Sequence, residues 1–174
     1  MNNNTFIHKY ISSLITKDDI CADMTCGNGN DTLFLLKKAK LVYAFDISEE
    51  AIESTRSRTK DFQNLILIHD SHVNADIHIK DRLKLAIFNL GYLPYAENPS
   101  ITKANDTLVA FRKTYELLED NGYLVITFYL GHKGGKNEYY LLDDHIKKNS
   151  LFVQERYSQD RINSPITYII KKIS

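Results

Sequence analysis

Apolar and polar positions alternate along the chain in segments of strand and helix length. Short apolar runs bounded by polar residues are typical of buried strands, and they occur at residues 20–24, 41–45, 65–68, 83–88, 123–130, 151–157 and 167–173. Apolar side chains at helical spacing predict helices at residues 4–16, 49–59 and about 107–119, with further helices after Asn30 and up to Lys148. The alternation predicts an α/β fold, in which the polar residues 95–106 form a loop after the fourth strand.

The last two predicted strands are joined only by the short segment SQDRINSPI. Strands that are joined so closely must be antiparallel. NAD-binding domains lack such a hairpin, so a parallel sheet that ends in an antiparallel hairpin argues against an NAD-binding domain.

The stretch ICADMTCGNGND at residues 20–31 joins the first strand to the following helix. Gly27 and Gly29 permit a tight turn with no side chain between the backbone and a ligand. The helix that begins at Asn30 presents free backbone N–H groups, and the second strand ends at Asp46, whose carboxylate can accept hydrogen bonds from ribose hydroxyls. Such residues can also merely turn the chain and cap a helix, but their order along the chain favours a nucleotide-containing cofactor.

The same stretch distinguishes between cofactors. A dinucleotide site requires a third glycine in the spacing G-x-G-x-x-G, and Thr32 occupies that position here. Asp23, at the end of the first strand, would repel a pyrophosphate and suits a cationic ligand. The pattern D-x-x-x-G-x-G, followed by an acid after the second strand, resembles the first two motifs of class I S-adenosylmethionine (SAM) methyltransferases. This resemblance implies that SAM is the cofactor and that Asp46 holds its ribose.

The third predicted strand ends in His69-Asp70-Ser71-His72. In class I methyltransferases this strand end lies beside the adenine, so Ser71 and His72 are expected to contact the adenine edge. His69, Asp70 and His72 suggest a metal site as an alternative, but no further ligand cluster stands out and their spacing is not that of a helix turn. We therefore expect no metal.

The fourth predicted strand ends in NLGYLP at residues 89–94, which resembles the N-P-P-Y motif of amino-methylating class I methyltransferases. The side-chain carbonyl of Asn89 can accept a hydrogen bond from a target amine, and Tyr92 offers a face on which a base can stack. The alternative is a strand-ending turn with Gly91 at positive φ and Tyr92 in the core. The preceding cofactor motifs favour the catalytic interpretation.

The fifth predicted strand is followed by the basic, glycine-rich loop GHKGGK at residues 131–136. Lys133 and Lys136 are candidates for contacts with phosphate, although a glycine-rich turn with solvated lysines is the alternative. A general base for an amine substrate could be His132, His72 or water, and the sequence leaves this open.

Composition and charge limit the class of protein. The 174 residues have no net charge, which argues against a protein that holds nucleic acid through a global basic field. Cys21 and Cys26 are expected to be buried thiols, since no other cysteine completes a metal set. His8 and Lys9 fall on the polar side of the first helix and are expected to be solvated. The N-terminus does not resemble a signal peptide and no apolar run reaches membrane-spanning length, so we expect a cytoplasmic protein without a membrane association.

Taken together, several segments resemble one family from about Phe6 to the C-terminus. They are DMTCGNGNDT, VYAFDIS, NLIL with DSH, IFNLGYLP, ITK with the following TL, YLGHKGG with Glu138, and QDRINSP. The chain is similar to the YtqB/MnmM family, small Rossmann-like SAM methyltransferases formerly described as rRNA methylases. The resemblance implies N-methylation of 5-aminomethyl-2-thiouridine at tRNA wobble position 34, giving 5-methylaminomethyl-2-thiouridine, by a homodimer that binds the anticodon arm of tRNA.

The resemblance also implies roles for individual residues. The expected catalytic residues are Asn89, Tyr92 and His132. The expected cofactor-binding residues are Asp23, Thr25, Gly27, Asn28, Gly29, Asn30, Asp31, Asp46, Ile47, Ser71, His72 and Asn89. The expected substrate-binding residues are Leu90, Gly91, Lys133, Lys136 and Arg161. The chain departs from the family at Asn30 in place of His, at Tyr95-Ala96-Glu97 in place of Gly-Gly-Asp, and in the tail QDRINSP in place of N-Q-x-N-x-P-P.

The expected fold is α/β: one Rossmann-like class I methyltransferase domain over residues 1–174, with a mostly parallel seven-stranded sheet, an antiparallel C-terminal strand and helices on both faces. Two alternative functions remain. One is a SAM-dependent methyltransferase for rRNA or a small amine metabolite, and the other is a non-catalytic SAM- or RNA-binding module.

Overall fold

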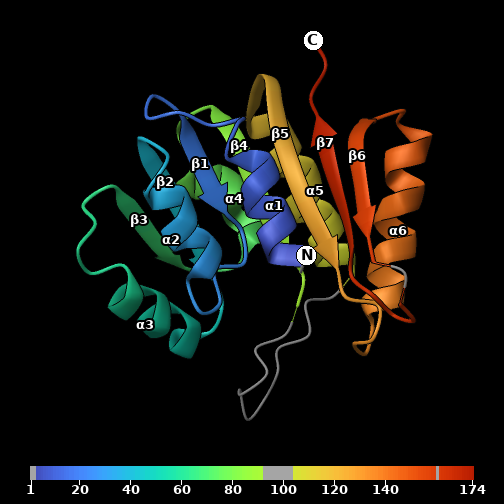
Figure 1. The fold of residues 1–174 in the computed structure, drawn as a ribbon, viewed down its shortest axis with the longest axis horizontal. Helices are drawn as coiled ribbons and strands as arrows, with labels where there is room; N and C mark the ends of the chain where they lie inside the picture. The colour runs from blue at the N-terminus through green and yellow to red at the C-terminus, as the bar shows by residue number, and fades with distance from the viewer. Residues whose placement is uncertain (1–2, 92–103, 160) are drawn as a thin grey trace.

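The computed structural model describes residues 3–91, 104–159 and 161–174, and its centre is a seven-stranded sheet (Figure 1). The strands are β1 (Ile20–Asp23), β2 (Leu41–Asp46), β3 (Leu65–His69), β4 (Leu83–Asn89), β5 (Leu118–Phe128), β6 (Phe152–Ser158) and β7 (Ile166–Lys171). Their order is β3-β2-β1-β4-β5-β7-β6, and all neighbours are parallel except β7, which is antiparallel to β5 and to β6. The predicted mostly parallel sheet with an antiparallel C-terminal strand is confirmed.

Helices cover both faces of the sheet. The described helices are α1 (Asn3–Ile11), α2 (Asn30–Leu36), α3 (Glu49–Arg58), the 3₁₀ turn η1 (His72–Asn74), α4 (Ala75–His78), α5 (Ala104–Leu117) and α6 (Gly135–Lys148). In Figure 1, α1, α2 and α3 lie in front of the sheet, whereas α4 and α5 lie behind it. None of the helices in the described part of the chain is long and apolar enough to cross a membrane.

The two helical layers explain why the strands are apolar on both faces. In β4, Ala86 and Phe88 belong to the core that α4, α5 and α6 cover, whereas Leu85 and Ile87 belong to the core under α1 and α2. Successive side chains of a strand point to opposite faces, so both sets must be apolar when both faces are covered. The strand β3 is the exception: it lies at the sheet edge and its Ile66 is 41% exposed, so the prediction of a fully buried strand was wrong there.

Some boundaries also differ from the predictions. The first helix ends at Ile11 rather than at residue 16, because the chain closes it with a tighter turn in which Leu14 N donates to Ile11 O at 2.9 Å. Leu118 begins β5 instead of continuing α5. The predicted turn at Asn121 lies inside β5, where φ is 62° at that residue and the register with β4 shifts between Leu118 and Tyr123. Lys136 lies in the first turn of α6 rather than in the preceding loop.

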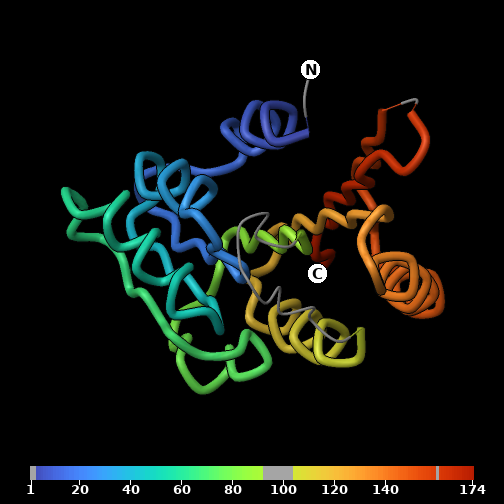
Figure 2. Tube along the Cα trace, turned by 90° about the horizontal axis from the view of Figure 1, so that it is seen from below, coloured from blue at the N-terminus to red at the C-terminus, as the bar shows by residue number. Residues whose placement is uncertain are grey.

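The carboxyl ends of the parallel strands meet at one edge of the sheet. The strand β1 pairs with β2 on one side and with β4 on the other. The direction in which successive strands are added to the sheet therefore reverses between β1 and β4. Ligands of open α/β sheets bind at such a reversal, outside the carboxyl ends of the strands. Figure 2 views the molecule from below, toward the edge from which α2, α3 and α6 begin.

Candidate active site

A buried carboxyl group stands at the end of β1. Asp23 is fully buried, and its Oδ2 accepts a hydrogen bond from Thr32 Oγ1 at 2.6 Å while its Oδ1 accepts one from Thr25 N at 3.2 Å. Burial, with the nearby charge of Asp31 as the second cause, raises the pKa of Asp23 to about 7. A cation at this position would favour the ionised carboxylate. Thr32, which departs from the dinucleotide pattern, supplies the hydroxyl donor that Asp23 needs.

The glycine loop after β1 is held in place by contacts with α3 and β2. Gly27 and Gly29 have positive φ values of 50° and 75°. A Cβ on Gly29 would lie 3.0 Å from Thr55, whose Oγ1 donates to Gly27 O at 3.1 Å. Asp46 accepts from Gly27 N at 3.0 Å and from Ser48 N at 3.0 Å. The loop therefore needs glycine both for its backbone angles and for the close approach of α3.

The residues expected around the cofactor differ in exposure. Asn28 in the loop and Asn30 at the start of α2 are exposed, as is Ile47 after β2, with 50% of its surface accessible. An exposed isoleucine next to the Asp46 carboxylate gives this strand end both an apolar and a polar contact surface. Ser48 caps α3, since its side chain accepts from Ala51 N.

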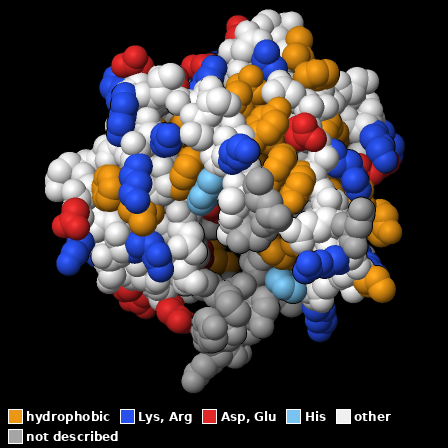
Figure 3. Space-filling model, in the orientation of Figure 1, with side chains coloured by type: hydrophobic (Ala, Val, Ile, Leu, Met, Phe, Trp, Pro, Cys, Tyr) orange, Lys and Arg blue, Asp and Glu red, His pale blue; other side chains and the backbone are white. Residues whose placement is uncertain are grey.

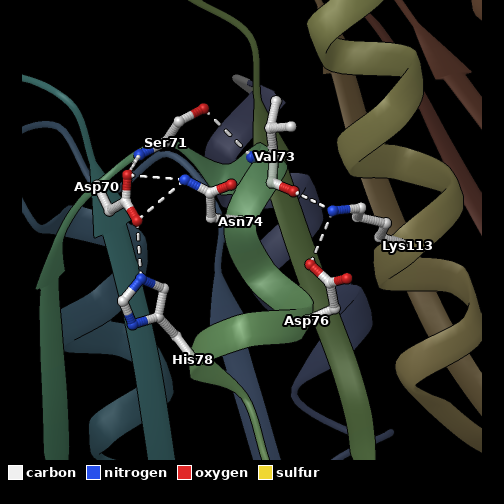
Figure 4. Close-up of polar contacts among 7 residues, drawn as sticks. All are labelled: Asp70, Ser71, Val73, Asn74, Asp76, His78 and Lys113. Atoms are coloured by element: carbon white, nitrogen blue, oxygen red, sulfur yellow. Dashed lines mark hydrogen bonds and ion pairs between the residues drawn. The ribbon is translucent and has the colours of Figure 1, made fainter.

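A hydrogen-bond network fixes the turn after β3 (Figure 4). Asp70 accepts from Ser71 N at 2.7 Å, from Asn74 Nδ2 at 3.1 Å and from His78 Nε2 at 2.8 Å. The hydrogen bond from His78 is the main cause that lowers the pKa of Asp70. Lys113 of α5 joins the same region by donating to Val73 O at 2.9 Å. The network holds Ser71 and the neighbouring His72 at the carboxyl edge of the sheet.

His72 is buried with one nitrogen that lacks a protein partner. Its Nδ1 lies 3.1 Å from Met24 O, which can only accept, so Nδ1 carries the proton. Its Nε2 has no hydrogen-bond partner within the described residues, and burial lowers the pKa of the imidazole. His72 therefore presents an acceptor nitrogen. In the parts of the chain that are described, no three His, Cys, Asp or Glu side chains form a group that could hold a metal ion.

Asn89 ends β4, and both its backbone and its side chain donate hydrogen bonds to side chains of the β1–α2 region. Its backbone N donates to Thr25 Oγ1 at 2.8 Å, and its Nδ2 donates to Asp31 Oδ2 at 3.1 Å. Its Oδ1 is buried and has no partner among residues 3–91, 104–159 and 161–174. A buried carbonyl oxygen without a donor is costly, so this atom is a natural acceptor for a ligand N–H.

The other oxygen of Asp31, Oδ1, contacts His8, a residue that the sequence did not place near the candidate site. His8 Nε2 lies 2.6 Å from Asp31 Oδ1, and its ring stacks on Phe34 with the centroids 4.1 Å apart. The prediction that His8 is solvated was wrong, whereas Lys9 is exposed as expected. The polar side of α1 at His8 faces the active-site end of α2.

The Tyr129 ring borders Gly91, and a second ring stacks on it. A Cβ on Gly91 would lie 3.3 Å from the Tyr129 ring, and Tyr129 stacks on His132 with an interplanar angle of 8°. Burial, followed by the charge of Asp31, raises the pKa of Tyr129. Gly91 does not have positive φ, and the side chain of Leu90 packs in the core. Tyr92 lies outside the described residues, as do residues 95–97.

The candidate RNA-binding residues lie at the surface. Lys133 in the β5–α6 loop, Lys136 in the first turn of α6 and Arg161 in the β6–β7 connection are all exposed. The start of α6 and the β6–β7 connection both lie at the lower edge in Figure 1, where the parallel strands end. On the face shown in Figure 3, lysines and arginines are scattered rather than gathered in one patch.

The two cysteines are free and buried in the described structure. Burial raises the pKa of Cys21 to about 12 and also raises the pKa of Cys26. The expectation of core thiols is confirmed.

Comparisons with known proteins identify the family. The profile of the family described as "Putative rRNA methylase" matches residues 42–171. The chain belongs to this rRNA methylase family. An Arabidopsis thaliana relative, named tRNA (mnm(5)s(2)U34)-methyltransferase, chloroplastic, is 35% identical over 147 residues, which cover 75% of this chain and 54% of the relative. The chain therefore spans about half the length of that relative.

Solved structures that are similar to this chain cover nearly all of it. A Streptococcus mutans protein in complex with S-adenosylhomocysteine (SAH) has a TM-score of 0.89 and 35% identity, with 99% of each chain covered. An rRNA methylase from Streptococcus thermophilus has a TM-score of 0.83 and 30% identity, with 100% of this chain and 98% of that chain covered. The predicted Rossmann-like methyltransferase fold and the predicted family resemblance are confirmed: the chain is a member of a methyltransferase family with a SAM-binding fold.

Proposed function

We propose that this protein is a SAM-dependent methyltransferase that methylates the aminomethyl group of 5-aminomethyl-2-thiouridine at tRNA wobble position 34. The product would be 5-methylaminomethyl-2-thiouridine. The observation that carries the proposal is the Asn89 side chain at the carboxyl end of β4, whose buried Oδ1 has no donor among the described residues. The name of the Arabidopsis relative supports the choice of the tRNA base.

The acidic residues at this edge fit a cationic cofactor. Asp23 is fully buried with a raised pKa, so a positive charge nearby would stabilise its ionised form. Asp46 stands at the end of the next strand, where its carboxylate can accept further hydrogen bonds from a ribose. His72 offers an acceptor nitrogen, without a partner among the described residues, that suits an exocyclic amino group of a purine. The SAH complex of the Streptococcus mutans protein supports the same choice of cofactor.

Bound SAM would supply an activated methyl group, so the residues of this chain mainly have to position the acceptor amine. An aminomethyl group is protonated at neutral pH and must lose a proton before it can attack. Asn89 Oδ1 can accept one N–H of the amine and thereby orient the nitrogen lone pair toward the methyl group. Tyr129 and His132 form an aromatic wall next to Gly91, on which a base could stack.

The direct test is methylation of tRNA by the purified protein. Transfer RNA that carries the aminomethyl precursor is incubated with SAM, and its nucleosides are analysed by mass spectrometry. We expect one methyl group to be added to the 5-aminomethyl-2-thiouridine of position 34. In a strain that lacks the gene, we expect the methylated form of this nucleoside to be absent from tRNA. Methylation of rRNA or of a small amine in place of tRNA would overturn the substrate, and SAM binding without any transfer would support a non-catalytic module.

The RNA contacts are tested by removing charge near the site. Changing Lys133 and Lys136 together to Ala should raise the apparent KM for tRNA and leave SAM binding unchanged. Each lost phosphate contact reduces the log–log salt slope by about 0.9 or less. A matched control changes the exposed Lys37 and Lys40 to Ala. Lys40 directly precedes β2 and so lies at the opposite edge of the sheet. Equal effects of both pairs would show that these lysines do not form a specific RNA contact.

Three further proposals rest on the family resemblance. They are a homodimeric assembly, binding to the anticodon arm and a cytoplasmic location. Measurement of the mass in solution tests the first, and tRNA fragments limited to the anticodon arm test the second.

A further inference from the structure

A chain of side-chain hydrogen bonds connects α1 to the candidate catalytic amide. His8 Nε2 lies 2.6 Å from Asp31 Oδ1, and Asp31 Oδ2 accepts from Asn89 Nδ2 at 3.1 Å. The three residues come from α1, α2 and the end of β4. Because a carboxylate can only accept hydrogen bonds, the amide nitrogen of Asn89 must face Asp31 and the imidazole must donate from Nε2.

The orientation of the Asn89 amide decides which atom a substrate meets. With Nδ2 bound to Asp31, the opposite atom Oδ1 is the one without a partner in the part of the chain that the structure describes. If the amide were turned over, an NH₂ group would meet the substrate amine, and two donors would face each other. Asp31 therefore selects the orientation that can accept an N–H from an amine.

His8 in turn fixes Asp31. The imidazole ring is stacked on Phe34, with an interplanar angle of 11° and a centroid distance of 4.1 Å. The adjacent Ile7 is buried, so α1 is anchored on the sheet while His8 points toward α2. The charge of Asp31 contributes to the raised pKa values of Asp23 and Tyr129, so Asp31 lies near both groups. A hydrogen-bond donor to Asp31 reduces the repulsion between Asp31 and Asp23.

We propose that His8 and Asp31 are positioning residues, which hold the Asn89 amide so that Oδ1 accepts a hydrogen bond from the substrate amine. The inference rests on the proposed amine methylation, but the orientation itself can be measured without it. In this arrangement α1 is part of the active site and not only a cover for the sheet.

The kinetic test compares variants of His8. His8→Leu removes the donor to Asp31, and we expect kcat to fall by about ten- to a hundredfold with little change in the affinity for SAH. His8→Gln places an amide nitrogen at a similar reach, and it should restore most of kcat. Tyr10→Phe is the matched control, because it removes a hydrogen bond of α1 to Gln154 on β6, at 2.9 Å, and leaves the His8 contacts in place.

A spectroscopic test on the free protein separates this inference from the proposed reaction. The side-chain NH₂ signals of Asn89, assigned with Asn89→Ala, should be shifted and protected from exchange in the wild type and in His8→Gln. They should lose protection in His8→Leu. Unchanged Asn89 signals and unchanged kcat in His8→Leu would overturn the inference, as would equal losses of kcat in His8→Leu and Tyr10→Phe. An inactive wild type with protected Asn89 signals would overturn the proposed function alone.

Discussion

The hydrogen bond between Thr32 and Asp23 gives a sharp test of the site's electrostatics. Thr32→Val keeps the shape of the side chain and removes the hydroxyl that donates to Asp23 Oδ2 at 2.6 Å. Both residues are fully buried, so water cannot replace the lost donor. The substitution therefore leaves one oxygen of a buried carboxyl group without its side-chain partner.

The magnitude of the effect depends on the charge of Asp23. A hydrogen bond to a neutral group contributes about 1 kcal/mol to the free energy of unfolding, and one to a charged group about 1.5–3 kcal/mol. The folded-state pKa of Asp23 is raised to about 7 from 3.8, so the free energy of unfolding falls as pH rises from about 4 to about 7. Loss of the donor raises this pKa further, so the variant should lose about 1 kcal/mol at pH 5 and about 2 kcal/mol or more at pH 8.

The assay is chemical denaturation of both proteins across pH 5–8, together with Tm. A loss of about 2 kcal/mol corresponds to a decrease in Tm of about 4–8 °C for a chain of this size. Thr114→Val is the matched control, because Thr114 is also fully buried and its Oγ1 has no partner in the described structure. It should be neutral or slightly stabilising at every pH. A Thr32→Val effect that equals the control, or that does not grow with pH, would refute the reasoning.

Four other variants, of which Gly131→Ala is a control, test further positions in and near the site. Gly135→Ala should strongly destabilise the protein, because its Cβ would lie 2.1 Å from Tyr129 O, whereas Gly131→Ala meets only ordinary contacts and should leave Tm nearly unchanged. Asn89→Ala should lower turnover strongly and keep SAM affinity in calorimetry; loss of SAM binding with a normal rate at saturation would place Asn89 in the cofactor shell. Asp46→Ala should weaken SAM binding by a few kcal/mol at most, with no gain in NAD binding, and unchanged SAM affinity would exclude its proposed role at the ribose.

The fold and the arrangement of the glycine loop were predictable because their signals are local. The glycine loop, the helix after it and the acid at the end of β2 follow from residues close in sequence, and the structure places them at one edge. The antiparallel end of the sheet followed from the short connection between β6 and β7. The local pattern did not predict where a strand lies within the sheet. The apolar run of β3 is typical of a central strand, but β3 lies at the edge of the sheet.

The residues that sequence reasoning missed make contacts between distant segments. His8 was assigned to solvent because it lies on the polar side of a helix, but a polar side can also face a polar site. Thr55 supports the glycine loop from α3, and Tyr129 borders Gly91 from the end of β5. Amphipathic spacing indicates which side of a helix avoids the core, and it does not indicate what that side meets.

The contacts around Asp31 connect the two halves of the proposed reaction. On one side it lies close enough to Asp23 to raise the pKa of that buried acid, and on the other it fixes the amide of Asn89. A cation bound near Asp23 would stabilise the ionised form of that buried carboxyl group. Asp31 accepts hydrogen bonds from both His8 and Asn89, so one side chain borders the buried acid and also holds the amide that faces the substrate amine.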